Sequence, residues 1–372
     1  MRIAIVGAGL AGLTCAAELQ AREHQVTVYE AHAEVGGRTA TRDTEAGGFD
    51  LGAQYFTARG AVFSKRLAAW REAGWIERWR PKLAILERGV ASRRSAAARD
   101  AEAASGSDGT KGDASRWVAV PGMHSLCQQL AQGLDVRTSQ QVVELQEEGK
   151  SWLLKIHADS VPVAATAGPF DAVILALPAA QAALLLQPVP ALAQRAARAH
   201  LAPCWSLTLA FQQALPLDFD GAWVRSSRLA WIAREPSKPQ RRVGERWVAH
   251  ASPAWSVEHF HDEPERARSK LQKAFHEATG CAMQPLSSAV YRWRFAQADR
   301  LLAGICLWQA KRRLGACGDW FAGELDDSAG RLEHAYLSGL ALAETVGCCH
   351  LFPVSPALRT KPRSGSMVKK PF

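Results

Sequence analysis

The first thirty residues alternate apolar runs with short polar breaks in a pattern that predicts strand, helix and strand. Residues 2–6 form a short apolar run typical of a buried parallel strand. Small residues at helical spacing follow over residues 11–22, and residues 25–30 alternate and are rich in β-formers. A strand–helix–strand unit of about 30 residues is the setting that a dinucleotide-binding fold requires.

The rest of the chain mixes both periodicities. Helical spacing recurs at residues 62–73, 123–132, 179–200 (in part), 263–278 and 332–346. Strands are predicted at 117–120, in a three-strand meander over 136–163, and at 170–177, 205–211, 229–233, 247–251, 288–293 and 314–318. Residues 91–115 hold almost no large apolar side chain and predict a poorly ordered surface excursion. We therefore predict an α/β fold, α+β overall: a Rossmann-like domain with a parallel sheet and a β-meander, and a second domain with an antiparallel sheet and helices.

Composition narrows the classes of protein. The 372 residues suffice for two domains, and the formal net charge is +9. Part of that charge lies in residues 359–370, which carry five basic residues and no acid, so we read residues 351–372 as a flexible basic tail and expect no nucleic-acid partner. The 8 cysteines show no metal-site spacing, so no metal is expected. Without a long apolar run or a leader pattern, we expect a cytoplasmic protein that does not enter a membrane.

The strongest chemical signal is Gly7-Ala8-Gly9-Leu10-Ala11-Gly12, between the first strand and the first helix. Gly7 permits a tight turn, Gly9 lets the backbone approach a pyrophosphate, and Gly12 lets the helix pack closely on the sheet. The helix N-terminus at Leu10 and Ala11 offers free N–H groups to phosphate oxygens. In this setting the motif predicts a dinucleotide site.

An acid and a second glycine pair favour FAD among the dinucleotides. Glu30 ends the second strand, beside Ala31, where a carboxylate accepts bonds from ribose hydroxyls and repels a 2′-phosphate. The alternative for Glu30 is a plain surface glutamate. Gly36 and Gly37 then bring a loop close, and Arg38 can bond a phosphate; a plain nicotinamide dehydrogenase does not need this element.

The far end of the chain supplies a second half of the site. Gly318 and Asp319 leave an apolar strand, so the carboxylate can reach the ribityl hydroxyls of a flavin. The helix from about Leu332 can aim its N-terminus at the flavin pyrimidine, although a glycine turn with a capping aspartate would look the same. The predicted cofactor contacts also include Ala53, Gln54, Tyr55, Val143, Ala176, Arg331, Leu332, Glu333 and Ala335.

Longer motifs carry a family resemblance. They are residues 50–59, 117–123, 231–234 with 237–239, 250–252 with 255–256, 292–293, 318–320, and 331–333 with 338–339. With these motifs the chain resembles the FAD-dependent amine-oxidase-like flavoproteins and, within them, the bacterial renalases. The resemblance implies non-covalent FAD and two domains. The FAD-binding domain would be discontinuous (1–60, 116–190 and 300–350), and 61–115 with 191–299 would form the substrate domain.

The resemblance also implies a reaction, the oxidation of misplaced dihydronicotinamide isomers of NAD(P) by hydride transfer to flavin N5, with molecular oxygen giving hydrogen peroxide. Aromatic side chains could stack on the nicotinamide or the flavin, and an arginine could meet a phosphate or the carboxamide. The substrate-facing candidates are Gln54, Tyr55, Trp231, Arg234, His250 and Trp293.

Two other functions remain open. One is a flavin amine oxidase or desaturase acting on a small organic substrate, for which neither an aromatic cage nor a lysine can be placed from the sequence. The other is an FAD-binding redox protein without turnover. Tyr291 and His334 keep the latter in view, because they stand where renalases usually have histidine and glycine.

Overall fold

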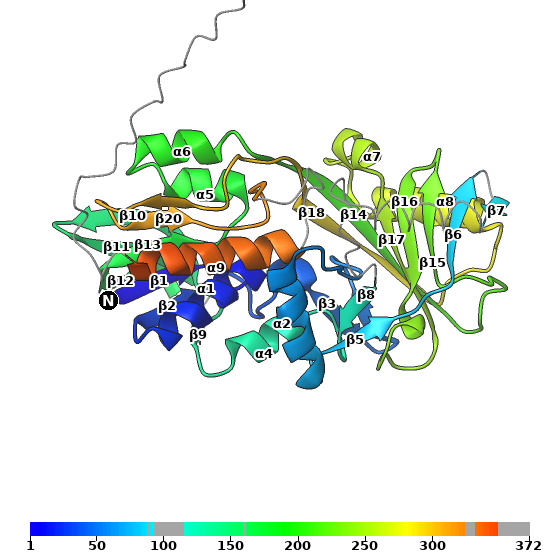
Figure 1. The fold of residues 1–372 in the computed structure, drawn as a ribbon. Coiled ribbons are helices and arrows are strands. Elements are labelled where there is room, and N and C mark those ends of the chain that lie inside the picture. Colours follow the sequence, from blue (N-terminus) through cyan, green and yellow to red (C-terminus); the bar gives the residue numbers. More distant parts are fainter. Residues whose placement is uncertain (88–89, 93–114, 159–160, 324–331, 349–372) are drawn as a thin grey trace, which may run out of the picture.

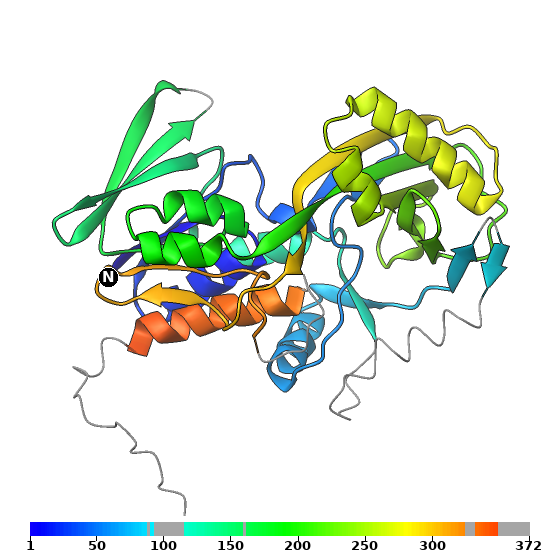
Figure 2. The same cartoon turned by 90° about the horizontal axis from the view of Figure 1, so that it is seen from above.

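The computed structural model describes residues 1–87, 90–92, 115–158, 161–323 and 332–348, arranged in two lobes (Figures 1 and 2). The first lobe is built on a six-stranded sheet of order β19-β20-β13-β1-β2-β9, in which β19 alone is antiparallel to its neighbour. Its strands are β1 (Arg2–Val6), β2 (Gln25–Tyr29), β9 (Asp135–Arg137), β13 (Ala172–Leu175), β19 (Leu307–Gln309) and β20 (Leu314–Ala316). The predicted parallel sheet is confirmed.

Both faces of this sheet are covered, which explains why β1 is apolar at successive positions. Ile3 and Ile5 pack toward the helices, whereas Ala4 and Val6 pack toward the meander. The helices on the first face are α1 (Leu10–Ala21), α2 (Ala61–Glu72), α4 (Ser125–Ala131) and α9 (Leu332–Cys348). The other face meets the three antiparallel strands β10 (Gln141–Glu148), β11 (Ser151–Ala158) and β12 (Val161–Phe170), with α5 (Ala179–Leu185) and α6 (Pro190–Ala196).

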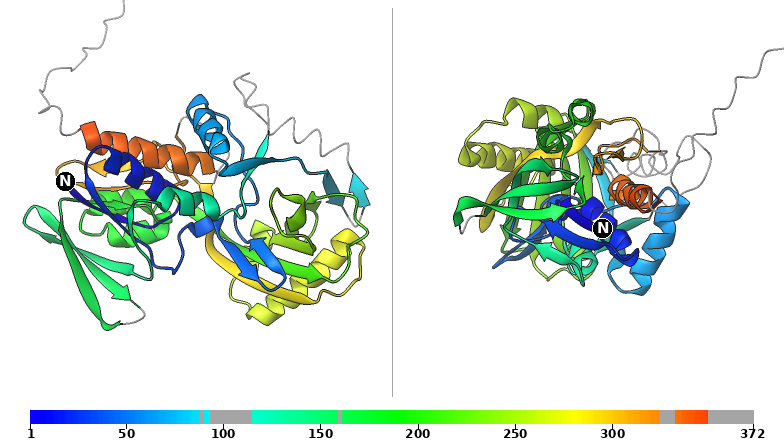
Figure 3. Two further views of the ribbon diagram at one scale, coloured as in Figure 1. Left: turned by 90° about the horizontal axis from the view of Figure 1, so that it is seen from below. Right: turned by 90° about the vertical axis from the view of Figure 1, so that its left-hand side faces the viewer.

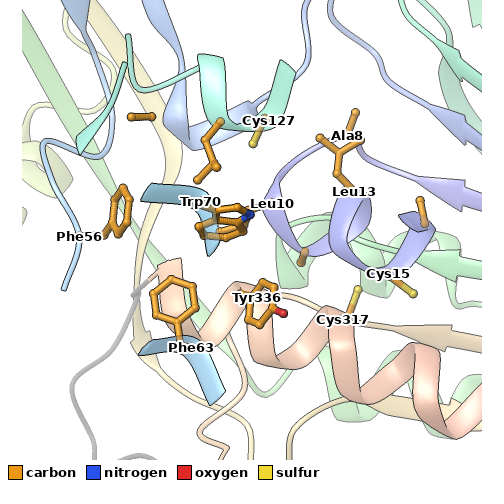
Figure 4. Close-up of a cluster of buried hydrophobic side chains, with 14 of the residues drawn as sticks. Ala8, Leu10, Leu13, Cys15, Phe56, Phe63, Trp70, Cys127, Cys317 and Tyr336 are labelled. Atoms are coloured by element: carbon orange, nitrogen blue, oxygen red, sulfur yellow. The ribbon is translucent and has the colours of Figure 1, made fainter. Parts of the chain in front are cut away.

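The C-terminal helix lies along the first helix (Figure 3). A Cβ atom on Gly339 would lie 2.3 Å from the Ala11 carbonyl oxygen, so only glycine permits this approach. A cluster of rings attaches α2 to α9 (Figure 4): Tyr336 lies 5.4 Å from Phe63 and 5.7 Å from Trp70, between ring centroids. Segments from the two ends of the sequence thereby form one core.

The second lobe is a seven-stranded sheet of order β18-β14-β17-β16-β15-β6-β7, antiparallel except for the β15–β6 pair. Its strands are β6 (Leu83–Glu87), β7 (Val90–Ser92), β14 (His200–Phe211), β15 (Gly221–Arg225), β16 (Leu229–Arg234), β17 (Glu245–Ala251) and β18 (Ser287–Arg300). The helices α7 (Pro253–Glu258) and α8 (Pro264–Thr279) cover one face. The other face packs toward the first lobe.

Short elements between the lobes complete the fold. They are the hairpin β3 (Thr41–Thr44) and β4 (Gly47–Asp50), the pair β5 (Ile76–Trp79) and β8 (Arg116–Ala119), and the 3-10 turns η1 (Gly37–Thr39) and η2 (Glu235–Ser237).

Three sequence expectations need correction. The meander runs over 141–170, because residues 135–137 join the parallel sheet instead, and the single strand predicted at 170–177 is divided by a bend at Asp171. The sequence gives no sign of this bend, because Phe170 and Ala172 on its two sides are both apolar and buried. The strands β6 and β15 were not predicted. Of the surface excursion predicted at 91–115, residues 91–92 belong to strand β7 and residues 93–114 lie outside the described residues, as does the whole tail predicted at 351–372.

Candidate cofactor and substrate site

The glycine turn after β1 has the geometry that a phosphate group needs. Gly7 has φ +106° and its Cβ would lie 2.5 Å from the Ala176 carbonyl oxygen, while a Cβ on Gly12 would lie 2.1 Å from the Gly7 oxygen. By contrast, a Cβ on Gly9 would meet no other group of the described residues within 4 Å. Gly7 and Gly12 therefore serve close packing, with Ala176 as the neighbour, and Gly9 leaves open space at the N-terminus of α1.

Glu30 is held at the end of β2 as a buried carboxylate. Its Oε2 accepts from the Ala8 backbone N–H at 2.8 Å, and its Oε1 accepts from the His32 backbone at 3.0 Å and lies 2.8 Å from the His32 ring. Burial acts to raise the pKa of Glu30, but these bonds outweigh it and lower the pKa. Nearby, Ala31 is exposed, and Val143 is 47% exposed at a bulge in β10, where backbone groups leave the ladder. Glu30 is thus held in place as a candidate acceptor for a ribose, and Val143 is an exposed candidate contact.

The second glycine loop lies against the first. The Gly36 N–H donates to the Ala8 oxygen at 2.9 Å, and a Cβ on Gly37 would lie 3.9 Å from the Gly9 Cα. Arg38 was expected to bond a phosphate, and Asp319 a ribityl chain. In the structure the two bond each other through two contacts of 2.6 Å. The pair joins the predicted site elements from both ends of the sequence.

The N-terminus of α9 is tied to the loop that leaves the β4 strand. The Glu333 carboxylate is fully buried and accepts from the backbone N–H groups of Arg59, at 3.0 Å, and Gly60, at 2.7 Å. Leu332 and Ala335 are half-buried on the same turn. Glu333 therefore fixes the loop, and Arg331 lies outside the described residues.

These features fit a bound FAD. The space beside Gly9 and Gly37 would accept the pyrophosphate, and Glu30 would hold the ribose of the adenosine half. Asp319 and the start of α9 lie further along the same edge of the sheet, after β20. The residues that would hold FAD therefore come from three separate parts of the chain.

A row of polar and aromatic side chains crosses the face of the seven-stranded sheet that packs toward the first lobe. In register, Ser206 of β14 faces His250 of β17, His250 faces Trp231 of β16, and Trp231 faces Trp223 of β15. Trp293 of β18 continues the row beyond Ser206, with its Nε1 3.1 Å from the Ser206 Oγ. Three of the predicted substrate-facing residues are thus brought together.

The Leu51 carbonyl joins this row to the loop beside the cofactor site. It accepts from Ser206 Oγ at 2.9 Å, from His250 Nε2 at 3.0 Å and from Trp293 Nε1 at 3.3 Å. Because a carbonyl only accepts, His250 carries its proton on Nε2. Burial, aided by the charge of Lys238, lowers the pKa of His250 to about 4 against the opposing effect of the Leu51 bond. The imidazole is therefore uncharged at neutral pH.

Tyr55 rests on an aromatic group at one end of the row. Its ring lies 5.8 Å from those of Trp79 and Trp231, and Trp223 makes an edge contact with Trp231 at 5.2 Å. The Arg116 guanidinium lies 5.2 Å above the Tyr55 ring and 5.9 Å from that of Trp223. Sequence reasoning missed Trp79, Trp223 and Arg116, because their strands pair only in the folded chain.

Gln54 belongs to a buried ionic cluster that the sequence did not predict. Lys238 Nζ contacts Asp50 Oδ2 at 3.0 Å, Glu235 Oε1 at 2.7 Å and Gln54 Oε1 at 3.2 Å, and Arg241 contacts Asp50 at 2.8 Å. Burial raises the pKa of Glu235 to about 7. Burial also acts to raise the pKa of Asp50, but the two cations outweigh it and hold that pKa well below its usual range.

Arg234 does not join the other predicted substrate-facing residues. Its side chain donates to the Leu217 oxygen at 3.0 Å, lies 3.4 Å from Glu245 and stacks over Trp247 at 4.9 Å, on the helix-covered face of the sheet. Side chains alternate between faces along a strand, so residues three apart point to opposite sides. That rule, applied to Trp231 and Arg234, could have excluded the arginine from the sequence alone.

The chain resembles known proteins in family profile, in sequence and in fold. A profile described as "NAD(P)-binding Rossmann-like domain" matches residues 5–68, and one described as "Flavin containing amine oxidoreductase" matches residues 78–347. Among curated proteins, a 4,4'-diapophytoene desaturase (4,4'-diaponeurosporene-forming) of Staphylococcus haemolyticus is 48% identical over 52 residues, 14% of this chain and 10% of that protein. An L-amino-acid oxidase of Siganus canaliculatus is 46% identical over 63 residues, 16% of this chain and 12% of that protein. The chain therefore spans about a tenth of the length of these relatives.

Solved structures match over nearly the whole chain. A putative protoporphyrinogen oxidase from Exiguobacterium sp. 255-15 superposes with a TM-score of 0.68 at 16% identity, covering 94% of this chain and 99% of that one. A putrescine oxidase bound to putrescine gives 0.67 at 16% identity, covering 93% and 99%. At this identity the likeness concerns the fold. Among the described residues, no helix is both long and apolar enough to cross a membrane.

The amine oxidoreductase profile covers well over half of the chain, and the glycine turn at the start of α1 leaves space in which a pyrophosphate would fit. The protein belongs to the flavin containing amine oxidoreductase family and is an FAD-dependent oxidoreductase.

Proposed function

We propose that the protein is an FAD-dependent oxidase of dihydronicotinamide isomers of NAD(P), as in the renalase-like flavoproteins. The observation that carries the proposal is the row of uncharged rings, Trp293, His250, Trp231 and Trp223, beside the turn that bears Tyr55. A dihydronicotinamide ring is flat and uncharged, so it gains from stacking on indole and phenol rings.

The charges around the rings favour this substrate over an ammonium ion. Two acids of the buried cluster next to Gln54, Asp50 and Glu235, are both paired with Lys238. Arg116 places a positive charge over Tyr55. With both acids paired to a cation of the chain, neither offers an unmatched negative charge to an ammonium group.

Bound FAD would supply the two-electron chemistry that converts the dihydronicotinamide to NAD(P)⁺ and passes the electron pair, with two protons, to O₂ as H₂O₂. The residues of the chain bind and orient the substrate. Tyr55 and Trp231 would hold the ring at a fixed distance from the cofactor. A hydride leaves with its electron pair, so the step needs no general base, which agrees with a neutral His250 that donates to Leu51.

The direct test is anaerobic mixing of the FAD-loaded protein with dihydro-NAD(P) isomers whose ring hydrogens are misplaced, followed by absorbance of the flavin. We expect rapid bleaching that air reverses with release of one peroxide per substrate. Ordinary NAD(P)H is the matched control and should bleach the flavin far more slowly. An oxidised flavin that persists with every isomer would overturn the proposal.

The same assay separates the two alternatives. Bleaching by a diamine or an amino acid, and not by dihydronicotinamides, would indicate an amine oxidase, whose neutral substrate form the rings of Tyr55 and Trp231 could also contact. A flavin that none of these compounds reduces would indicate a redox protein without turnover on them.

A further inference from the structure

Four side chains of opposite charge are buried together where the two lobes meet. Lys238, Asp50 and Glu235 are fully buried, and the Arg241 side chain is 3% exposed. Taking such charges out of water costs several kcal/mol for each ion, and well-packed apolar residues often stabilise a protein as much or more. A cluster of this kind therefore calls for a role beyond stability.

Lys238 is the member of the cluster that reaches the turn bearing Tyr55. An ammonium has three donors, and Lys238 directs them at Asp50, Glu235 and Gln54. Its Nζ also lies 6.0 Å from the centre of the Trp79 ring, against which Tyr55 is packed. One buried cation thus contacts the residue before Tyr55 in the chain and the ring beside it in space.

Gln54 transmits this contact along the turn. While its Oε1 accepts from Lys238, its Nε2 donates to the backbone oxygens of Asp50 and Gly52, the latter at 3.2 Å. The side-chain amide therefore lies across its own turn and closes it. With Gln54 held at both ends, the direction in which Tyr55 leaves the turn is determined.

We propose that Lys238 is a positioning residue, which through Gln54 and Trp79 holds the turn at residues 51–55 so that Tyr55 faces the row of rings on the seven-stranded sheet. Its contribution to turnover rests on the proposed function. The placement of the turn does not, because it can be measured on the FAD-bound protein without any substrate.

The experiment separates positioning from charge balance. Lys238→Met removes the ammonium that pairs with Asp50 and Glu235, and the second change in the double variant E235Q/K238M removes the charge that Glu235 carries when it is ionised. Gln54→Leu breaks the link to the turn and leaves the ion pairs. Arg246→Met is the matched control, because Arg246 is equally buried but bonds the carbonyl oxygens of Ala46, Arg242 and Val243, away from the turn.

Each variant is purified with FAD and measured by thermal unfolding and by visible circular dichroism of the flavin, which reports the groups around the ring. We expect K238M to lower both the unfolding temperature and the dichroism, and E235Q/K238M to recover the unfolding temperature alone. Q54L should lower the dichroism as K238M does. The double variant Q54L/K238M should show no larger decrease than K238M alone, because both changes break the same link. R246M should affect stability alone. Wherever a dihydronicotinamide bleaches the wild type, the bleaching rate should fall at least tenfold in K238M and stay low in E235Q/K238M.

Recovery of the dichroism in E235Q/K238M would overturn the proposal, since Lys238 would then be a counter-ion only. A wild-type dichroism in Q54L would overturn the route through Gln54. Should K238M fail to fold, Q54L and E235Q/K238M still decide the question. If no dihydronicotinamide bleaches the wild-type flavin, the proposed function fails while the dichroism still tests Lys238.

Discussion

Substitution of Gly9 by alanine should weaken FAD binding, whereas substitution of Gly12 by alanine should destabilise the fold, although the two residues lie only three positions apart in one turn. In the part of the chain that the structure describes, a Cβ at position 9 would meet no other group within 4 Å. Gly9 has φ −81° and ψ 179°, which alanine adopts freely. A Cβ at position 12 would lie 2.1 Å from the Gly7 oxygen and 2.9 Å from the Ala176 Cβ, far inside contact distance.

The magnitudes follow from these distances. Gly9→Ala lowers the conformational entropy of the unfolded chain, which stabilises the fold by about 0.4–1 kcal/mol. Alanine is also a poorer helix cap than glycine, which costs a similar amount, so the free energy of unfolding should change by less than about 1 kcal/mol. The methyl group would nevertheless occupy the space that we assign to the pyrophosphate. Loss of one hydrogen bond to a charged group costs about 1.5–3 kcal/mol, so the Kd for FAD should rise about 10- to 100-fold. Gly12→Ala should cost about 3 kcal/mol of stability or more.

The assay uses both apoproteins. Urea unfolding followed by tryptophan fluorescence gives the free energy of unfolding, and titration with FAD, followed by quenching of flavin fluorescence, gives Kd. Gly9→Ala should unfold like the wild type and bind FAD weakly, whereas Gly12→Ala should unfold early. Wild-type FAD affinity in Gly9→Ala would refute the placement of the pyrophosphate beside Gly9.

Three further predictions follow from the same geometry. The folded pKa of His250 is about 4, below its ordinary value of 6.5, so its contribution to stability is complete above pH 6.5 and is lost as the pH falls to 4. The loss of stability reaches about 3 kcal/mol. Urea unfolding at several pH values should show a smaller loss in His250→Asn, and the same dependence of stability on pH in the variant and the wild type would contradict the prediction. Arg234→Ala should lower the free energy of unfolding by about 1–3 kcal/mol without slowing flavin reduction, whereas Trp231→Ala should slow flavin reduction. Stopped-flow absorbance of the flavin measures both rates, and slow flavin reduction in Arg234→Ala would show that Arg234 does act in the substrate site. Asp319→Asn and Arg38→Met should each raise the Kd for FAD. Because the two side chains form one bidentate pair, their effects should be less than additive in the double variant, and additive effects in the FAD titration would show that they act separately.

The predicted elements held best where the signal is local. The first strand, helix and strand were predicted to within two residues at each end, since burial of both faces makes β1 apolar at successive positions. Prediction was poorer at residues 170–177, where one apolar run covers the end of β12 and the whole of β13. Burial is the same on both sides of the bend at Asp171, so the pattern of apolar residues carries no sign of it.

By itself the sequence determined the cofactor end of this protein. A dinucleotide fold binds a pyrophosphate through the backbone of one tight turn. Here that turn, with its glycines, and the acid that follows it lie in one contiguous segment, residues 7–30. The tertiary structure alone decided the rest. It paired Arg38 with Asp319, brought Lys238 onto Asp50 and Gln54, and placed Trp223 and Arg116 around Tyr55. These contacts join residues far apart in the chain, and their partners are set by strand order, register and the face on which each side chain emerges, which only the packing of the two lobes fixes.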